Sequence, residues 1–121
     1  MTWRVIDLEE TDVYALHAAE DYFLDKVNKG LYPSIIMFSR LRRPGLSIGK
    51  AQHLAKDVDM TEVERLGIDL TRRTTGGRSV YLDQNHYIVS MIQQYDDGRD
   101  VTKVYQQTCS TVLHALRDVT G

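Results

Sequence analysis

Apolar and polar positions along the chain follow two different periods, which predict strands in some segments and helices in others. Residues 3–8 and 68–73 alternate between apolar and polar side chains, as half-buried strands do. The almost continuously apolar segments 34–39 and 87–92 predict buried strands, the second of them central in its sheet. The predicted strands are residues 3–8, 34–39, 46–48, 68–73, 79–82 and 87–92.

Three other segments carry the spacing or the capping residues of amphipathic helices. Residues 12–29 have an apolar stripe and are followed by Gly30. A capping box that starts at Asp59 predicts a short helix ending at Gly67. Asp100 is expected to cap a last helix with an apolar stripe. The residues with helical spacing are Val101, Tyr105, Val112, Leu116 and Val119, with Val104 and Cys109 beside them.

Together these elements predict an α/β or α+β fold, with a mixed, largely antiparallel sheet and helices packed on it. Residues 34–39 and 46–48 are expected to pair as a hairpin, because only a short turn separates them. No glycine-rich segment joins a strand to a helix, so neither a Rossmann nor a P-loop nucleotide site is expected. We expect residues 1–121 to form a single domain.

Composition and charge exclude several classes of function. The 121 residues carry a net charge of −2 and include one cysteine. A nearly balanced charge argues against a nucleic-acid partner. One cysteine excludes an intrachain disulfide and fits a reducing compartment. No apolar run reaches the ~18 residues that a membrane span requires, so we expect no membrane partner and a cytoplasmic location.

The segment from Arg72 to Asp83 joins an arginine pair, two adjacent glycines and a third arginine between two predicted strands. Gly76 and Gly77 allow positive φ, permit the close approach of a ligand and leave main-chain N–H groups accessible. The neighbouring guanidinium groups fit a carboxylate or phosphate in a bidentate manner. The combination predicts an anion-binding loop, and the alternative is an ordinary hairpin turn with solvated arginines.

The pattern RRxxGGxxVxxD at residues 72–83 resembles the signature of the lipoate-protein ligase and octanoyltransferase family, within the biotin/lipoate protein ligases. The resemblance extends over nearly the whole chain, through residues 3–7, 14–20 and 46–52. It implies a role in protein lipoylation, in which lipoate or octanoate is attached to a lysine of a lipoyl carrier domain or of the glycine cleavage H protein. Lipoate or octanoate would be the substrate, with ATP and Mg²⁺ needed by a ligase.

In the family this loop holds the acyl chain and, in ligases, the acyl-adenylate. The resemblance therefore implies an acyl or adenylate site made of Arg72, Arg73, Thr75, Gly76, Gly77, Arg78, Ser79, Tyr81 and Asp83. Four further residues are candidates for the same site, namely Gly49, Lys50, Gln52 and His86. Lys50 could meet an anionic group there, and His86 could act as a general base.

Three positions depart from the family pattern. Arg78 replaces a third glycine, Leu82 replaces a histidine, and Ile88 replaces an asparagine that faces the adenylate and its magnesium in ligases. These changes weaken the prediction of a nucleotide site, whereas arginine at position 78 also occurs in octanoyltransferases and favours a transferase-like pocket. The catalytic lysine or cysteine of the family would follow the last residue of this sequence. We therefore expect catalysis to require a second subunit or a further segment.

Two alternatives to a ligase remain. One is acyl transfer of the octanoyltransferase kind, and the other is a non-catalytic lipoate- or acyl-binding regulatory module. Half of a catalytic domain would also leave a sheet edge exposed, through which the chain could form a homodimer. Cys109 is expected to be a small buried helix residue. His17, His53 and His114 are expected to be structural or surface residues, and we predict no metal site.

Overall fold

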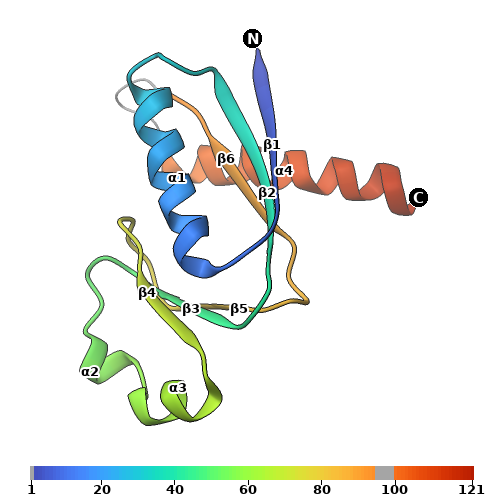
Figure 1. The fold of residues 1–121 in the computed structure, drawn as a ribbon. Helices are drawn as coiled ribbons and strands as arrows, with labels where there is room; N and C mark the ends of the chain where they lie inside the picture. The colour runs from blue at the N-terminus through green and yellow to red at the C-terminus, as the bar shows by residue number, and fades with distance from the viewer. Residues whose placement is uncertain (1, 95–99) are drawn as a thin grey trace.

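The computed structural model describes residues 2–94 and 100–121, so the loop predicted at residues 96–98 lies outside the described residues. The predicted order of strands and helices is confirmed, with one short helix added (Figure 1). The elements are β1 (Trp3–Thr11), α1 (Val13–Asn28), β2 (Ser34–Leu41), β3 (Gly45–Ile48), α2 (Leu54–Asp57), α3 (Met60–Leu66), β4 (Asp69–Arg72), β5 (Val80–Leu82), β6 (Ile88–Ile92) and α4 (Val101–Thr120). None of the described helices is both long and apolar enough to cross a membrane.

The strands form two mixed sheets of three strands each. Sheet A has the order β1-β2-β6, and sheet B has the order β4-β3-β5. In each sheet one outer strand is parallel to the central strand and the other is antiparallel to it. The predicted class, a mixed α+β fold with helices against its sheets, is confirmed. The strands are divided between two sheets, whereas the sequence pattern predicted one.

The predicted hairpin of residues 34–39 and 46–48 is wrong, because β2 and β3 belong to different sheets. The chain crosses between the sheets at Gly45, where a Cβ would lie only 2.8 Å from the Cβ of Val13 on α1. This close approach lets the chain leave sheet A beside the start of α1. β3 then becomes the central strand of sheet B, with both of its edges occupied by β4 and β5.

Strands β4 and β5 both pair with β3 and not with each other. The Gly-Gly segment between them is therefore a loop that crosses over β3, which excludes the hairpin-turn alternative. β6 was predicted to be central, and this is wrong for the part of the chain that the structure describes. There it pairs with β2 alone and forms an edge of sheet A.

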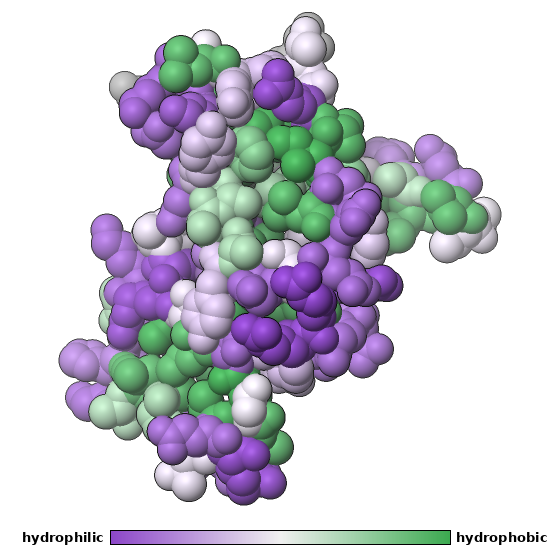
Figure 2. All heavy atoms as spheres, in the orientation of Figure 1, coloured by the Kyte–Doolittle hydropathy of each residue, from purple (hydrophilic) through white to green (hydrophobic). Residues whose placement is uncertain are grey.

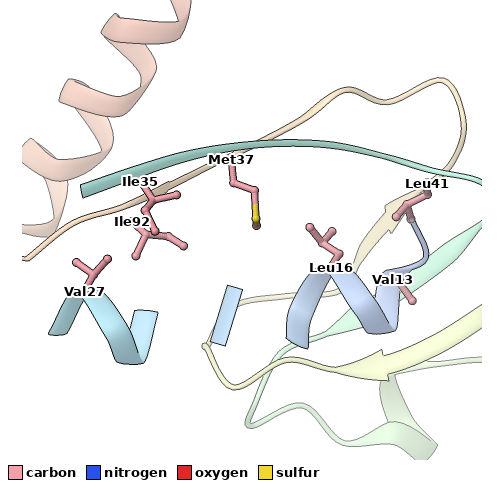
Figure 3. Close-up of a cluster of buried hydrophobic side chains, with 7 residues drawn as sticks. All are labelled: Val13, Leu16, Val27, Ile35, Met37, Leu41 and Ile92. Carbon is pink, nitrogen blue, oxygen red and sulfur yellow. The ribbon is translucent and has the colours of Figure 1, made fainter. Parts of the chain in front are cut away.

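Helix α1 covers one face of sheet A and forms the core with it. Its first turn is capped by the carboxylate of Asp12, which accepts a hydrogen bond of 2.8 Å from the N–H of Ala15. Leu16 packs between α1 and β2, close to Met37 (Figure 3). The buried cluster consists of Val13, Leu16, Val27, Ile35, Met37, Leu41 and Ile92. This core fixes the position of α1, which supplies polar side chains to the site described below.

Helix α4 begins after Asp100, as predicted, but its apolar stripe is not core. None of its residues is buried, and Leu116 and Val119 are 56% and 85% exposed. Cys109 is exposed as well, so the prediction that it is buried is wrong. The reason is that α4 lies over the face of sheet A opposite α1 and projects beyond it (Figure 1), with apolar side chains on the projecting part (Figure 2). The periodicity of the sequence locates an apolar helix face but does not say what covers it.

Candidate functional site

A cleft of about 820 Å³ lies beside the Gly-Gly loop. Its polar wall includes six of the residues predicted for the acyl site, namely Arg73, Thr75, Gly76, Gly77, Arg78 and Ser79. Its apolar wall comes from α1, sheet B, β6 and α4, through Leu16, Val80, Leu82, Ile88 and Tyr105. A volume of this size and a wall with polar groups on one side and apolar groups on the other are typical of small-molecule sites.

A second, smaller cleft of about 430 Å³ lies on the other side of a polar partition. Both clefts are lined by His17 and Glu20 of α1 and by Arg73 and Thr75 of the loop. The second cleft is further lined by Asp21, Leu24, Thr74, Ser90, Met91, Ile92 and Gln93. The side chains that separate the two clefts are therefore held between α1 and the loop.

The guanidinium of Arg73 holds the loop in shape. Its Nη1 donates to the carbonyl oxygen of Ser47 at 3.0 Å and to Oγ of Ser47 at 3.2 Å. Its Nη2 donates to the carbonyl oxygens of Gly76 at 2.9 Å and Arg78 at 2.7 Å. These donors are directed to the protein itself, so the geometry gives Arg73 a structural role. Its predicted role as an anion ligand stays a prediction.

The Arg73 contacts determine where the loop N–H groups point. In a trans peptide the C=O and the following N–H point in opposite directions. The N–H groups of Gly77 and Ser79 therefore point away from the guanidinium that holds the preceding carbonyls. No protein acceptor for the main-chain N–H groups of residues 74–79 is present within the described part of the chain. Gly77 has φ of +100°, which meets the predicted need for a residue without Cβ.

Arg72 holds a second loop, residues 49–52, against the first. Its Nη1 donates to the carbonyl oxygens of Gly49 at 3.1 Å, Lys50 at 3.2 Å and Gln52 at 2.7 Å. The Gln52 side chain accepts hydrogen bonds from the N–H of Gly49 at 2.8 Å and from the hydroxyl of Ser79 at 3.2 Å. Gly49 and Gln52 thus support the loop from behind, and Lys50 is exposed.

The remaining predicted residues lie away from the larger cleft. Nδ1 of His86 accepts a hydrogen bond of 3.0 Å from the N–H of Asp83 and lies 3.1 Å from the carboxylate of the same residue. The ring of Tyr81 meets that of His86 edge to face, with 6.4 Å between centroids. Partial removal from water and then the charge of Asp83 raise the pKa of Tyr81. None of the three lines the larger cleft, so the geometry does not bring His86 to a place where it could act as a base on a ligand there.

Sequence reasoning missed the polar side chains that support the loop from α1. Nδ1 of His17 lies 2.8 Å from a carboxylate oxygen of Glu20, and Nε2 of His17 lies 2.8 Å from Oγ of Ser47. The prediction that His17 is a hydrogen-bonded structural residue agrees with this geometry. A histidine and a glutamate three residues apart, next to the apolar stripe of a predicted helix, could have indicated that the two side chains pair with each other. The contact with Ser47, 30 residues away along the chain, had no local signal.

Comparisons with known proteins identify relatives over almost the whole chain. Residues 12–120 match the family model of the lipoyl protein ligase A/B catalytic domain. An octanoyltransferase LipM of Halalkalibacterium halodurans is 33% identical over 120 residues, which are 98% of this chain and 44% of the relative. The chain therefore spans less than half the length of this curated relative.

Solved structures of lipoate ligases have the same fold. A lipoate-protein ligase A bound with ATP has a TM-score of 0.79 and 27% identity, over 98% of this chain and 47% of the other. A Thermoplasma acidophilum protein with bound lipoic acid has a TM-score of 0.76 and 27% identity, over 97% of this chain and 48% of the other. A bi-partite lipoate protein ligase from the same organism, studied with its E2 lipoyl domain, also has a TM-score of 0.76 and 27% identity, over 97% and 45%.

Proposed function

The chain belongs to the lipoyl protein ligase A/B catalytic-domain family, and from this membership we propose that residues 1–121 form a single domain that binds the acyl group in protein lipoylation. The observation that carries the proposal is a cleft of about 820 Å³ that has an apolar wall and is lined by residues 75–79, in a loop whose main-chain N–H groups have no protein acceptor among the described residues. An acyl substrate needs both features, because its carboxyl end is polar and its tail is not.

The two walls of the cleft suit the two ends of lipoate or octanoate. N–H groups of Gly77 and Ser79 would donate to the carboxylate, or to the carbonyl oxygen of an activated acyl group, where negative charge develops during transfer. The exposed guanidinium of Arg78 adds a charged donor at the same wall. The alkyl tail would lie on the apolar wall, beside Val80, Leu82 and other residues. Of the site residues predicted from the sequence, Gly77, Arg78 and Ser79 would contact the acyl group in this arrangement.

A ligase reaction and an octanoyltransferase reaction are the two candidate activities. The neighbour solved with ATP supports the first, and the curated relative named octanoyltransferase, together with Arg78, supports the second. Within the described residues no group of three or more His, Cys, Asp or Glu side chains could hold Mg²⁺. Ile88 also takes the place of the asparagine that faces magnesium in ligases. An isoleucine cannot ligate Mg²⁺, and we derive no step that requires the metal.

The proposed acceptor is a lysine of a lipoyl carrier domain or of the glycine cleavage H protein. A neighbouring structure pairs a bi-partite ligase with an E2 lipoyl domain, which supports an acceptor of this kind. Pyrophosphate release from ATP in the presence of lipoate would identify a ligase. Transfer of octanoate from acyl carrier protein without ATP would identify a transferase. Binding of the acids without either reaction would favour the alternative of an acyl-binding module.

We expect octanoate to bind at this cleft and Arg78→Ala to weaken the binding about two- to fivefold, because an exposed ion pair contributes about 0.5–1 kcal/mol. Calorimetric titration of octanoate into both proteins measures the effect. Arg42→Ala is the matched control, since Arg42 is an exposed arginine in the turn between β2 and β3. Failure of the unmodified protein to bind octanoate or lipoate, or equal weakening by both substitutions, would contradict the proposal.

The groove between α4 and sheet A is the proposed docking surface for further polypeptide. Its volume is about 310 Å³ and its lining is apolar, with Ile36, Phe38, Val89 and Met91 from the sheet facing Val112 and Leu116 of α4. More than half the length of the relatives lies outside the match. We propose that the polypeptide bound in this groove is equivalent to the unmatched part of the relatives, and is not a second copy of this chain.

Light scattering and resonance shifts test the docking surface. We expect the chain alone to have the mass of a monomer. Addition of the unmatched part of the octanoyltransferase relative is expected to shift the resonances of the groove residues. Leu116→Glu should abolish these shifts, whereas Arg117→Glu, next to it on the exposed side, should retain them. A dimer that Leu116→Glu dissociates would identify a second copy as the occupant and overturn this part of the proposal.

A further inference from the structure

A continuous line of hydrogen bonds joins the edge of sheet A to the loop at residues 74–79. The hydroxyl of Ser90 on β6 donates to Oε1 of Glu20 at 2.7 Å, and Oε2 of Glu20 lies 2.8 Å from Nδ1 of His17. Nε2 of His17 lies 2.8 Å from Oγ of Ser47, which accepts from Nη1 of Arg73 at 3.2 Å. This line crosses from β6 through α1 to sheet B.

The network itself determines the tautomer of His17. Both oxygens of the Glu20 carboxylate act as acceptors, one for Ser90 and one for His17, so the proton of a neutral imidazole belongs on Nδ1. Nε2 is then an acceptor for the hydroxyl proton of Ser47. With its proton directed to His17, the hydroxyl of Ser47 presents lone pairs to the guanidinium of Arg73. Every donor in the line meets one acceptor.

We propose that His17 is a positioning residue that determines the direction of the N–H groups of Gly77 and Ser79, and that Glu20 holds the imidazole in the tautomer that this requires. His17 acts through Ser47, whose orientation fixes the guanidinium that holds the carbonyl oxygens of Gly76 and Arg78. The side chain of His17 is 14% exposed and that of Glu20 is 31% exposed, so water competes weakly for these hydrogen bonds. Only one test of this inference, the measurement of octanoate binding, rests on the proposed function.

Two substitutions of His17 separate the two halves of the line. In His17→Asn the amide reaches the place of Nδ1, so the contact with Glu20 is retained and that with Ser47 is lost. In His17→Gln the amide reaches the place of Nε2, so the contact with Ser47 is retained and that with Glu20 is weakened. Both replace an imidazole by a neutral amide of smaller volume. A role that is only structural predicts similar effects of the two changes.

We expect His17→Asn to weaken octanoate binding about three- to tenfold, which is about 0.7–1.4 kcal/mol and the effect of one lost hydrogen bond. His17→Gln should bind within about twofold of the unmodified protein. Titration calorimetry measures both, and thermal unfolding records any common loss of stability. Equal affinities for the two variants, or losses that follow their unfolding temperatures alone, would overturn the proposal.

Amide resonances of the loop test the same inference without a ligand. In ¹H–¹⁵N spectra of the ligand-free protein, Gly77 and Ser79 should shift in His17→Asn and remain near their original positions in His17→Gln. If these shifts occur while octanoate fails to bind the unmodified protein, the positioning role is supported and the proposed function is rejected. If octanoate binds and the loop resonances respond equally to both variants, the positioning role is rejected alone.

Discussion

Replacing Gly49 by alanine is expected to destabilise the protein by about 2–3 kcal/mol, because the new methyl group has no space. Gly49 is buried, and a Cβ there would overlap the carbonyl oxygen of Gly77 and lie 2.9 Å from its carbonyl carbon. These are main-chain atoms, so no side chain can rotate away. The loops at residues 49–52 and 73–79 would have to separate, which would also break the hydrogen bond of 2.9 Å between the N–H of Lys50 and the carbonyl oxygen of Thr75.

Gly76→Ala is the matched control for Gly49→Ala. A Cβ at Gly76 would meet no atom within 4 Å, and its φ is outside the range that requires glycine. We expect the control to change the free energy of unfolding by less than about 0.5 kcal/mol in urea denaturation. Similar unfolding free energies for the two variants would contradict the close packing of the loops.

Local features of the fold were predictable because their causes lie within a few residues. Asp12 and Asp59 cap the helices that follow them, and each accepts a hydrogen bond from an N–H three residues later. Gly67 ends α3 with φ of +62°, as expected of a C-terminal glycine. Segments with helix or strand periodicity therefore have the predicted type, and the departures are found mainly at their ends.

Pairing of the strands was not predictable in the same way. A strand pattern records which faces are buried, but it does not identify the neighbour that supplies the hydrogen bonds. Gly45 separates β2 from β3 because of its contact with Val13, which lies 32 positions earlier in the sequence. The exposed stripe of α4 has a related cause, since the pattern is the same whether the apolar face packs in this chain or against another polypeptide.

The glycine pair singled out from the sequence lines the larger cleft, but the contacts of the neighbouring arginines could not be read from the sequence. A guanidinium beside a glycine pair can donate to a ligand or to main-chain carbonyls, and the sequence does not distinguish these. The structure directs both Arg72 and Arg73 to carbonyl oxygens and leaves Arg78 exposed at the cleft. Which arginine can meet an anion therefore depended on three-dimensional contacts between β3 and the loop.

Arg73→Ala is expected to destabilise the protein by about 1.5–3 kcal/mol and to weaken acyl binding by at least tenfold. The substitution removes four hydrogen bonds, two to Ser47 and one each to the carbonyl oxygens of Gly76 and Arg78. Released carbonyls would let the peptide groups rotate, so the N–H groups of Gly77 and Ser79 would no longer be held in one direction. Lysine should not restore the loop, because one ammonium group cannot reproduce the fork of a guanidinium.

A neutral ligand distinguishes two roles of Arg73: a clamp, which holds the loop through its carbonyl oxygens, and a direct contact with the carboxylate of the bound acid. If Arg73 holds the loop, Arg73→Ala should weaken the binding of lipoamide and of lipoate to a similar extent, since both ligands depend on the same N–H groups. If Arg73 instead contacts the carboxylate directly, Arg73→Ala should weaken the binding of lipoate alone. Arg40→Ala provides the control for loss of an arginine, because Arg40 forms an exposed ion pair with Glu10 and such pairs contribute about 0–1 kcal/mol. Calorimetric titration of both ligands into the three proteins would decide between these roles, and an effect of Arg73→Ala confined to lipoate would refute the clamp.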